Sequence, residues 1–226
     1  MMPRTKFDYS LIPARPDLQF EQALWNKGLR RVAGVDEAGR GALIGPVAAA
    51  AVVLPCDQAD LFDKLAGVRD SKEMKPEERD YWAIEIKSVA VAWAVGYASA
   101  AEIDQIGIAP ATRLAAERAL GQLPLKVEHI LIDYISLPDV ATPQTPLIKG
   151  DARSLTIAAA SVLAKTGRDA ILAAMDAEFP GYGLAQNKGY ATAAHRAAIA
   201  SLGPCAQHRH SFAPIRVEGE EEQQEE

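Results

Sequence analysis

Residues 31–41 read RVAGVDEAGRG, and this stretch determines how the rest of the chain is interpreted. Residues 31–36 form a short Val- and Ala-containing run that ends at a charged residue, which is typical of a buried strand. Asp36 and Glu37 stand together at its end. Two like charges are costly there unless a cation or a hydrogen-bond network compensates them. The stretch therefore predicts a strand that carries a pair of carboxylates to a functional site.

The chain around this stretch predicts an α/β fold. Residues 46–54 (PVAAAAVVL) form a second apolar run, and the glycine-rich connection before it indicates a hairpin. We expect further strands at 89–97 and 129–133, and helices at 110–120, 155–177 (capped by Ser154) and 192–201. Strands early in the chain and helices late indicate a central mixed β-sheet flanked by helices, with a C-terminal helical region.

Length and composition indicate one folded domain in a cytoplasmic protein. The 226 residues are 49% hydrophobic, which allows a sizeable core. We expect a lead-in at 1–30, a catalytic domain at 31–215 and an acidic, disordered tail at 216–226. There is no apolar run of the ~20 residues that a membrane helix needs and no hydrophobic signal core. The two cysteines fit a reducing compartment, and we expect a monomer.

The net charge of -6 argues at first against a nucleic-acid partner, because phosphate binding depends largely on Lys and Arg. However, six glutamates lie between residue 218 and residue 226, and leaving out their six charges brings the charge of the remaining chain to zero. The charge balance is therefore compatible with a nucleic-acid partner.

Two further carboxylates belong to the same prediction. Asp133 ends the strand HILID, and its carboxylate reaches the edge where Asp36 lies if the two strands are neighbours. Oxygen ligands of this kind suit Mg²⁺ or Mn²⁺, which leave room for a substrate phosphate. The alternative is that acids at strand ends only cap turns. Asp151 precedes the long helix, where its charge alone could complement the helix dipole.

The loop after the acid pair, Gly39-Arg40-Gly41, can bring backbone amides close to phosphate or hydroxyl oxygens. A dinucleotide-binding loop is the competing interpretation. Here, however, the spacing differs from that fingerprint and a second strand follows where a helix is required. A simple tight turn is the remaining alternative.

Taken together, the motifs resemble those of the ribonuclease HII family, over about residues 34–212. They are, in order, 36–41 (DEAGRG), 70–72 (DSK), 102–104 (EID), 149–151 (KGD), 157–161 (IAAAS) and 187–192 (NKGYAT). Ribonuclease HIII resembles the same core but usually carries an extra N-terminal domain, and only 35 residues precede Asp36. The resemblance therefore favours type HII.

The resemblance implies a ribonuclease H-like fold and an endonuclease that acts on RNA·DNA hybrids and at ribonucleotides embedded in duplex DNA. Asp36, Glu37, Asp133 and Asp151 would be catalytic and hold two Mg²⁺ or Mn²⁺ ions. Cleavage would fall 5′ of the ribonucleotide and leave 3′-hydroxyl and 5′-phosphate ends.

Substrate contacts are also implied. Gly39, Arg40 and Gly41 would contact the ribose 2′-hydroxyl, the group that distinguishes RNA from DNA. Tyr190 would pack at the same nucleotide, although alone it could equally be a core aromatic. The remaining predicted substrate-binding residues are Ser71, Lys72, Lys165 and Arg168; the three cations could hold the duplex backbone or be ordinary solvated charges.

Several points stay open. The family commonly has Gly after the third acid, whereas this chain has Tyr134, and Gly107 stands where Asn is common. We expect a structural role for His195 and a surface or turn role for residues 208–210 (HRH). Alternative functions are a non-catalytic nucleic-acid-binding protein and another metal-dependent nuclease on the same fold.

Overall fold

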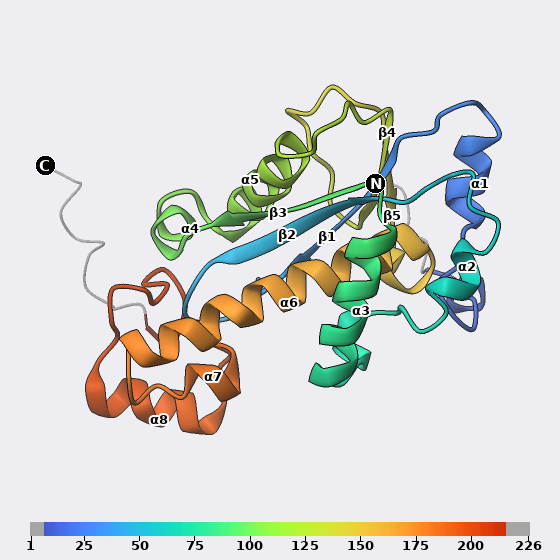
Figure 1. Ribbon diagram of the computed structural model, residues 1–226. Helices are drawn as coiled ribbons and strands as arrows, with labels where there is room; N and C mark the ends of the chain where they lie inside the picture. The colour runs from blue at the N-terminus through green and yellow to red at the C-terminus, as the bar shows by residue number, and fades with distance from the viewer. Residues whose placement is uncertain (1–6, 216–226) are drawn as a thin grey trace, which may run out of the picture.

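A computed structural model describes residues 7–215 of the chain, and one mixed five-stranded sheet organises this region (Figure 1). The strand order is β3-β2-β1-β4-β5. The central strand β1 pairs antiparallel with β2 and parallel with β4, while β2–β3 is antiparallel and β4–β5 parallel. The bounds are β1 Val32–Ala38, β2 Val47–Val53, β3 Ala92–Ala98, β4 His129–Asp133 and β5 Gln144–Leu147.

Helices cover both faces of the sheet, and shorter ones extend the molecule at either end (Figure 1). The α-helices are α1 Gln19–Trp25, α2 Leu61–Lys64, α3 Pro76–Val89, α4 Ala100–Ile106, α5 Ile108–Gly121, α6 Leu155–Glu178, α7 Leu184–Asn187 and α8 Ala193–Leu202. Three 3₁₀ turns complete the described elements: η1 Tyr9–Leu11, η2 Ser71–Glu73 and η3 Gly150–Ala152. No helix among these is long and apolar enough to cross a membrane.

The core has two layers because β2 alternates its side chains between the two faces. Ala49 and Ala51 pack on the side of α5, whereas Ala50 and Val52 pack on the side of α6. A Cβ atom at Gly34 would lie 2.3 Å from the Thr156 carbonyl carbon. Only glycine therefore lets β1 approach α6 this closely, which brings the end of β1 beside that helix.

The lead-in packs on the start of α6. Leu155 N donates to Asp17 O, and the fully buried Glu21 of α1 accepts hydrogen bonds from Ser154 Oγ (2.5 Å) and Thr156 N (2.9 Å). Burial raises the pKa of Glu21 despite these bonds. The lead-in thus adds a buried polar contact at the end of α6 that is next to Asp151.

The predicted fold class is confirmed. Residues 129–133 form the predicted strand, and Ser154 caps α6 by accepting a hydrogen bond from Ile157 N. The strand expected at 89–97 was placed too early, because α3 continues to Val89 and β3 begins at Ala92. The segment between the helices expected at 155–177 and 192–201 contains a short helix, α7, that was not predicted. The tail at 216–226 lies outside the described residues.

Candidate active site

Two of the predicted carboxylates are brought together by neighbouring parallel strands. In the register of β1 and β4, Val35 lies opposite Ile132, so Asp36 and Asp133 follow at the same level. Both strands end here, and Glu37 continues β1. The condition on which the placing of Asp133 depended, that the two strands are neighbours, is met. The edge formed by these strand ends therefore carries three carboxylates.

The fourth carboxylate comes from the turn before α6. Asp151 lies in η3 and is only 3% exposed. The preceding residue, Gly150, donates its backbone N–H to Asp133 Oδ1 at 2.7 Å. This bond fastens η3 to the end of β4, so the turn that carries Asp151 stays beside the other acids.

Burial and mutual repulsion disfavour the charged forms of these acids. Burial is the main cause that raises the pKa of Asp36, and Glu37, Asp133 and Asp151 raise it further. The pKa values of Glu37 and Asp133 are also raised, mainly by burial. The pKa of Asp151 is raised to about 6 by burial and then by Asp70 and Asp133. The site therefore favours binding of positive charge.

Unpartnered oxygen atoms support a cation site. Asp36 Oδ2 and Asp151 Oδ1 are buried without a hydrogen-bond partner. Buried polar atoms normally have partners, and a missing ion is one explanation of an exception. Within residues 7–215 no three His, Cys, Asp or Glu side chains gather closely enough to enclose a metal by themselves. An open set of oxygen donors suits Mg²⁺, which keeps several waters.

Two cationic side chains lie among the acids. Arg40 forms an ion pair with Glu37, with 3.3 Å between Nη1 and Oε1. Partial burial opposes the charge on Lys72, but the carboxylates around it, Asp70 and Asp36 foremost, outweigh burial and raise its pKa. Lys72 therefore lies within electrostatic reach of the acid cluster.

The glycine loop starts after Ala38, one residue beyond the acid pair. Gly39 has φ +88°, a conformation that favours glycine, and Ala42 N donates to its carbonyl. Gly41 is exposed, and a Cβ atom there would meet nothing within 4 Å. The loop thus presents an open backbone surface beside Glu37.

The loop that carries Tyr190 lies against the glycine loop. Leu43 N donates to Gly189 O at 2.8 Å. The Tyr190 side chain is partly exposed, with Lys165 Nζ 5.2 Å and Arg168 Cζ 5.5 Å from its ring centroid. The structure therefore joins the two loops that the sequence motifs predicted to act together.

Comparison with known proteins shows the family to which the chain belongs. The family model of ribonuclease HII matches residues 33–215. The chain belongs to the ribonuclease HII family. The ribonuclease HII of Synechococcus sp. (strain JA-3-3Ab) is 53% identical over 202 residues, 89% of this chain and 90% of the relative. That of Moorella thermoacetica is 52% identical over 193 residues, 85% of this chain and 91% of the relative.

Solved structures support the ribonuclease HII fold. Ribonuclease H2 from Pyrococcus horikoshii superposes with a TM-score of 0.67 at 24% identity, covering 82% of this chain and 95% of that one. A PCNA:RNase HII complex from Archaeoglobus fulgidus gives 0.65 at 28% identity, covering 80% and 95%. The chain is thus an enzyme of the ribonuclease H class, a hydrolase and nuclease.

Two residues expected to bind substrate in this ribonuclease HII are buried. Arg168 is fully buried, and its guanidinium donates to the carbonyls of Pro46, Lys188 and Ile44 at 2.9, 2.8 and 3.1 Å. Ser71 is 3% exposed, and its Oγ lies 2.9 Å from Ser161 Oγ. The interpretation of Arg168 as a direct phosphate contact was wrong, because its donors are used inside the protein. Arg168 therefore holds the glycine loop and the Tyr190 loop together, whereas Ser71 fastens η2 to α6.

The other two predicted cations remain near the surface. Lys72 is exposed, whereas Lys165 forms an ion pair with Asp169, with 2.7 Å between Nζ and Oδ1. Asp169 also lies 3.6 Å from Arg79 Nη2, and Arg79 Nη1 donates to Ser71 O. Lys165 is therefore held beside Tyr190 by a partly buried network.

Residues 208–210 were expected to have a surface or turn role, and the surface part was wrong for two of them. His208 and Arg209 are fully buried, and His210 is exposed. Arg209 donates to the carbonyls of Gly45 (3.0 Å) and Arg40 (2.8 Å), so it supports the glycine loop. Charged residues in this part of the sequence suggest a solvent-exposed segment. Their burial depends on carbonyl groups that are distant in the sequence and that no local pattern shows.

Asp70 is a fifth carboxylate that the sequence analysis did not include in the site. It raises the pKa of both Asp151 and Asp133. Its Oδ1 also accepts a hydrogen bond from Lys72 N at 2.9 Å. The available signal was its place beside Ser71 and Lys72 in the quoted DSK motif.

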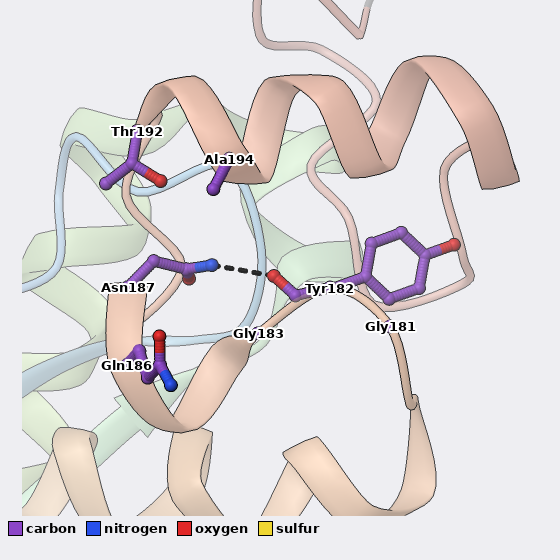
Figure 2. Close-up of a pocket in the computed structure, with 7 residues that line it drawn as sticks. All are labelled: Gly181, Tyr182, Gly183, Gln186, Asn187, Thr192 and Ala194. Carbon is purple, nitrogen blue, oxygen red and sulfur yellow. Dashed lines mark hydrogen bonds between the residues drawn. The ribbon is translucent and has the colours of Figure 1, made fainter.

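A pocket of about 300 Å³ lies next to the segment that carries Tyr190. Figure 2 shows the residues that line it: Gly181, Tyr182, Gly183, Gln186, Asn187, Thr192 and Ala194. Its lining includes none of the predicted site residues. Asn187 Nδ2 donates to Tyr182 O across it, and Asn187 Oδ1 accepts from Gly189 N, both at 2.7 Å. The pocket is thus a structural neighbour of the site, and its wall shapes the Tyr190 loop.

Proposed function

We propose that this ribonuclease HII is an endonuclease that hydrolyses the phosphodiester bond 5′ of a ribonucleotide. Its substrates are RNA·DNA hybrids and DNA duplexes with embedded ribonucleotides, and its products carry 3′-hydroxyl and 5′-phosphate ends. The observation that carries the proposal is the pair of unpartnered, buried oxygens of Asp36 and Asp151 beside the glycine loop.

The four acids fit two Mg²⁺ or Mn²⁺ ions. Asp36, Glu37, Asp133 and Asp151 would hold them, because these carboxylates share one edge of the fold and repel one another without positive charge. When bound, such ions supply an activated water and stabilise charge on the leaving oxygen. The protein's part is to keep the carboxylates fixed, as the bond from Gly150 does for Asp133.

The two joined loops are suited to sensing a ribose. Backbone groups of Gly39, Arg40 and Gly41 would meet the 2′-hydroxyl, because glycine permits close approach of a ligand. The partly exposed ring of Tyr190 would pack on the same nucleotide. Since Leu43 N bonds to Gly189 O, both contacts would keep a fixed spacing.

Lys72 and Lys165 would contact the backbone of the duplex without reading its sequence. Lys72 is exposed beside the acids, and Lys165 lies beside the Tyr190 ring. The buried side chains of Arg168 and Ser71 would hold in place the parts of the backbone near these contacts. We further propose that the enzyme acts as a monomer.

The test is cleavage of an end-labelled DNA duplex that contains one ribonucleotide, with an all-DNA duplex of the same sequence as control. We expect a cut 5′ of the ribonucleotide with Mg²⁺ or Mn²⁺, and no cut of the all-DNA duplex. Asp36→Asn should abolish the cut. Equal cutting of both duplexes would indicate a different metal-dependent nuclease, and binding without cutting would indicate a nucleic-acid-binding protein.

A further inference from the structure

Two buried histidines lie in series behind the Tyr190 loop. His195 of α8 and His208 are both 0% exposed, and their Nε2 atoms are 3.4 Å apart. On the far side of each ring, Nδ1 has a backbone partner: His195 Nδ1 lies 3.0 Å from Tyr190 O, and His208 Nδ1 lies 2.9 Å from Cys205 N. The rings therefore link the backbone of residue 205 to that of residue 190.

These partners determine where the protons sit. A carbonyl oxygen can only accept, so His195 Nδ1 must carry the hydrogen that Tyr190 O receives. A backbone N–H can only donate, so His208 Nδ1 must be the acceptor for Cys205 N. In neutral rings, His208 then carries its hydrogen on Nε2 and His195 has a bare Nε2. The 3.4 Å contact is thus a hydrogen bond from His208 to His195.

The chain of bonds has a single direction, and an additional proton is unfavourable in this geometry. A proton on His195 Nε2 would face His208 Nε2–H. A proton on His208 Nδ1 would face Cys205 N–H, with Cys205 Sγ at 3.2 Å as only a weak acceptor. Burial lowers the pKa of both histidines, which is consistent with two neutral rings. The Tyr182 ring packs against His208 with centroids 4.9 Å apart, so the rings have little freedom to turn.

We propose that His208 and His195 are positioning residues that set the Tyr190 backbone for ribonucleotide recognition. The proposal rests on the proposed function, because Tyr190 is there the residue that meets the nucleotide. His208 fixes the tautomer of His195, and His195 in turn holds the carbonyl of Tyr190. The segment after α8 thereby helps to determine how the ring of Tyr190 stands beside the glycine loop.

Ordinary core filling is the competing explanation, and paired variants separate the two. In His195→Asn, the amide nitrogen can replace Nδ1–H as donor to Tyr190 O, whereas His195→Leu fills space without donating. In His208→Gln, the amide nitrogen can replace Nε2–H, whereas His208→Leu cannot. His210→Gln is the matched control, because His210 is exposed.

We expect kcat/KM on the single-ribonucleotide duplex to fall about tenfold in each Leu variant, the order of one lost or misplaced hydrogen bond. The Asn and Gln variants should stay within about threefold of wild type, as should His210→Gln. Thermal melting would establish that all variants are folded. Equal losses in the amide and Leu variants, or no loss in folded Leu variants, would overturn the proposal.

A second readout does not depend on activity. Two-bond ¹H–¹⁵N correlation spectra of the whole protein at pH 8 report which ring nitrogen of each histidine carries hydrogen. We expect the Nδ1–H tautomer at His195 and the Nε2–H tautomer at His208, assigned by loss of each signal in the variants. Any other pair of tautomers overturns the chain of bonds. If the wild type cuts no substrate while these tautomers are found, the proposed function fails and the hydrogen-bonded chain stands.

Discussion

Gly39 lies directly against the buried guanidinium of Arg168. A Cβ atom at Gly39 would come within 1.9 Å of Arg168 Nε, which donates to Pro46 O. Residues other than glycine also rarely adopt a φ of +88°, the value at Gly39. The first residue of the glycine loop is therefore constrained by its own backbone and by Arg168.

Gly39→Ala should lower both stability and activity. The added methyl group must displace Arg168 from its three carbonyl partners, and the backbone at residue 39 becomes strained. We expect the free energy of unfolding to fall by about 2–4 kcal/mol, as for other overpacked or strained sites. Urea denaturation and cleavage of the single-ribonucleotide duplex would measure the two effects.

Gly41→Ala is the matched control, because a Cβ atom there has nothing within 4 Å and Gly41 is exposed. Its free energy of unfolding should stay within about 0.5 kcal/mol of wild type. A loss of stability at residue 41 equal to that at residue 39 would contradict the role given to Arg168.

Asp36→Asn should make the metal-free protein more stable. Burial raises the pKa of Asp36, and three nearby acids repel its charge, so the neutral amide removes an unfavourable charge. We expect a gain of about 1–3 kcal/mol in EDTA at pH 8. Differential scanning calorimetry with and without Mn²⁺ would measure it.

Mn²⁺ should raise the Tm of the wild type, because a ligand that binds only the folded state stabilises it. The same addition should change the Tm of Asp36→Asn less. Asp80→Asn, at an exposed position of α3, serves as control and should behave as wild type in both conditions. A metal response in Asp36→Asn equal to that of the wild type would argue against this ligand.

The sequence predicts those elements of the fold whose buried residues form a continuous apolar run in the chain. Residues 31–36 and 129–133 are apolar runs, and their ends fix where Asp36 and Asp133 lie. Strand β5 could not be predicted in this way, because Gln144–Leu147 is short and contains Pro146, which is tolerated at an edge. For α3, Pro76 at the start and Glu78, which accepts from Lys75 N, were usable signals.

The buried arginines that hold the loops of the site could not be predicted in this way. Arg168 and Arg209 are buried because carbonyls more than 100 positions away in the sequence accept their hydrogen bonds. Such partners exist only once the glycine loop, α6 and the C-terminal segment have come together. A sequence pattern can therefore identify the acids, whereas the residues that hold the loops require the fold.

Tyr134 carries a strained backbone at the edge of the site. It has φ 55° and is 70% exposed, so its ring contributes little packing within the described residues. Left-handed backbone costs a residue with a side chain about 1–2 kcal/mol. We expect Tyr134→Gly to be about 1 kcal/mol more stable than Tyr134→Ala in urea denaturation, because only glycine relieves the strain. Equal stabilities would indicate that residue 134 is unstrained.

The buried His208 predicts how stability depends on pH. Burial, and then His195 and His210, lower its pKa to about 4 from the ordinary 6.5. Between these values the unfolded chain binds the proton and the folded chain does not. The free energy of unfolding should therefore fall as the pH is lowered from 6.5 towards 4, by on the order of 1–3 kcal/mol from this group.

The variant His208→Gln isolates this effect. The active-site acids act in the opposite direction over the same range, since the pKa of Asp151 is raised to about 6 and protonation there favours the folded state. Because wild type and variant share those acids, the difference between their unfolding free energies reports His208. As the pH falls from 6.5 to 4.5, the free energy of unfolding of the wild type should fall relative to that of the variant. Parallel curves would show that His208 takes up its proton equally well in the folded and unfolded chains.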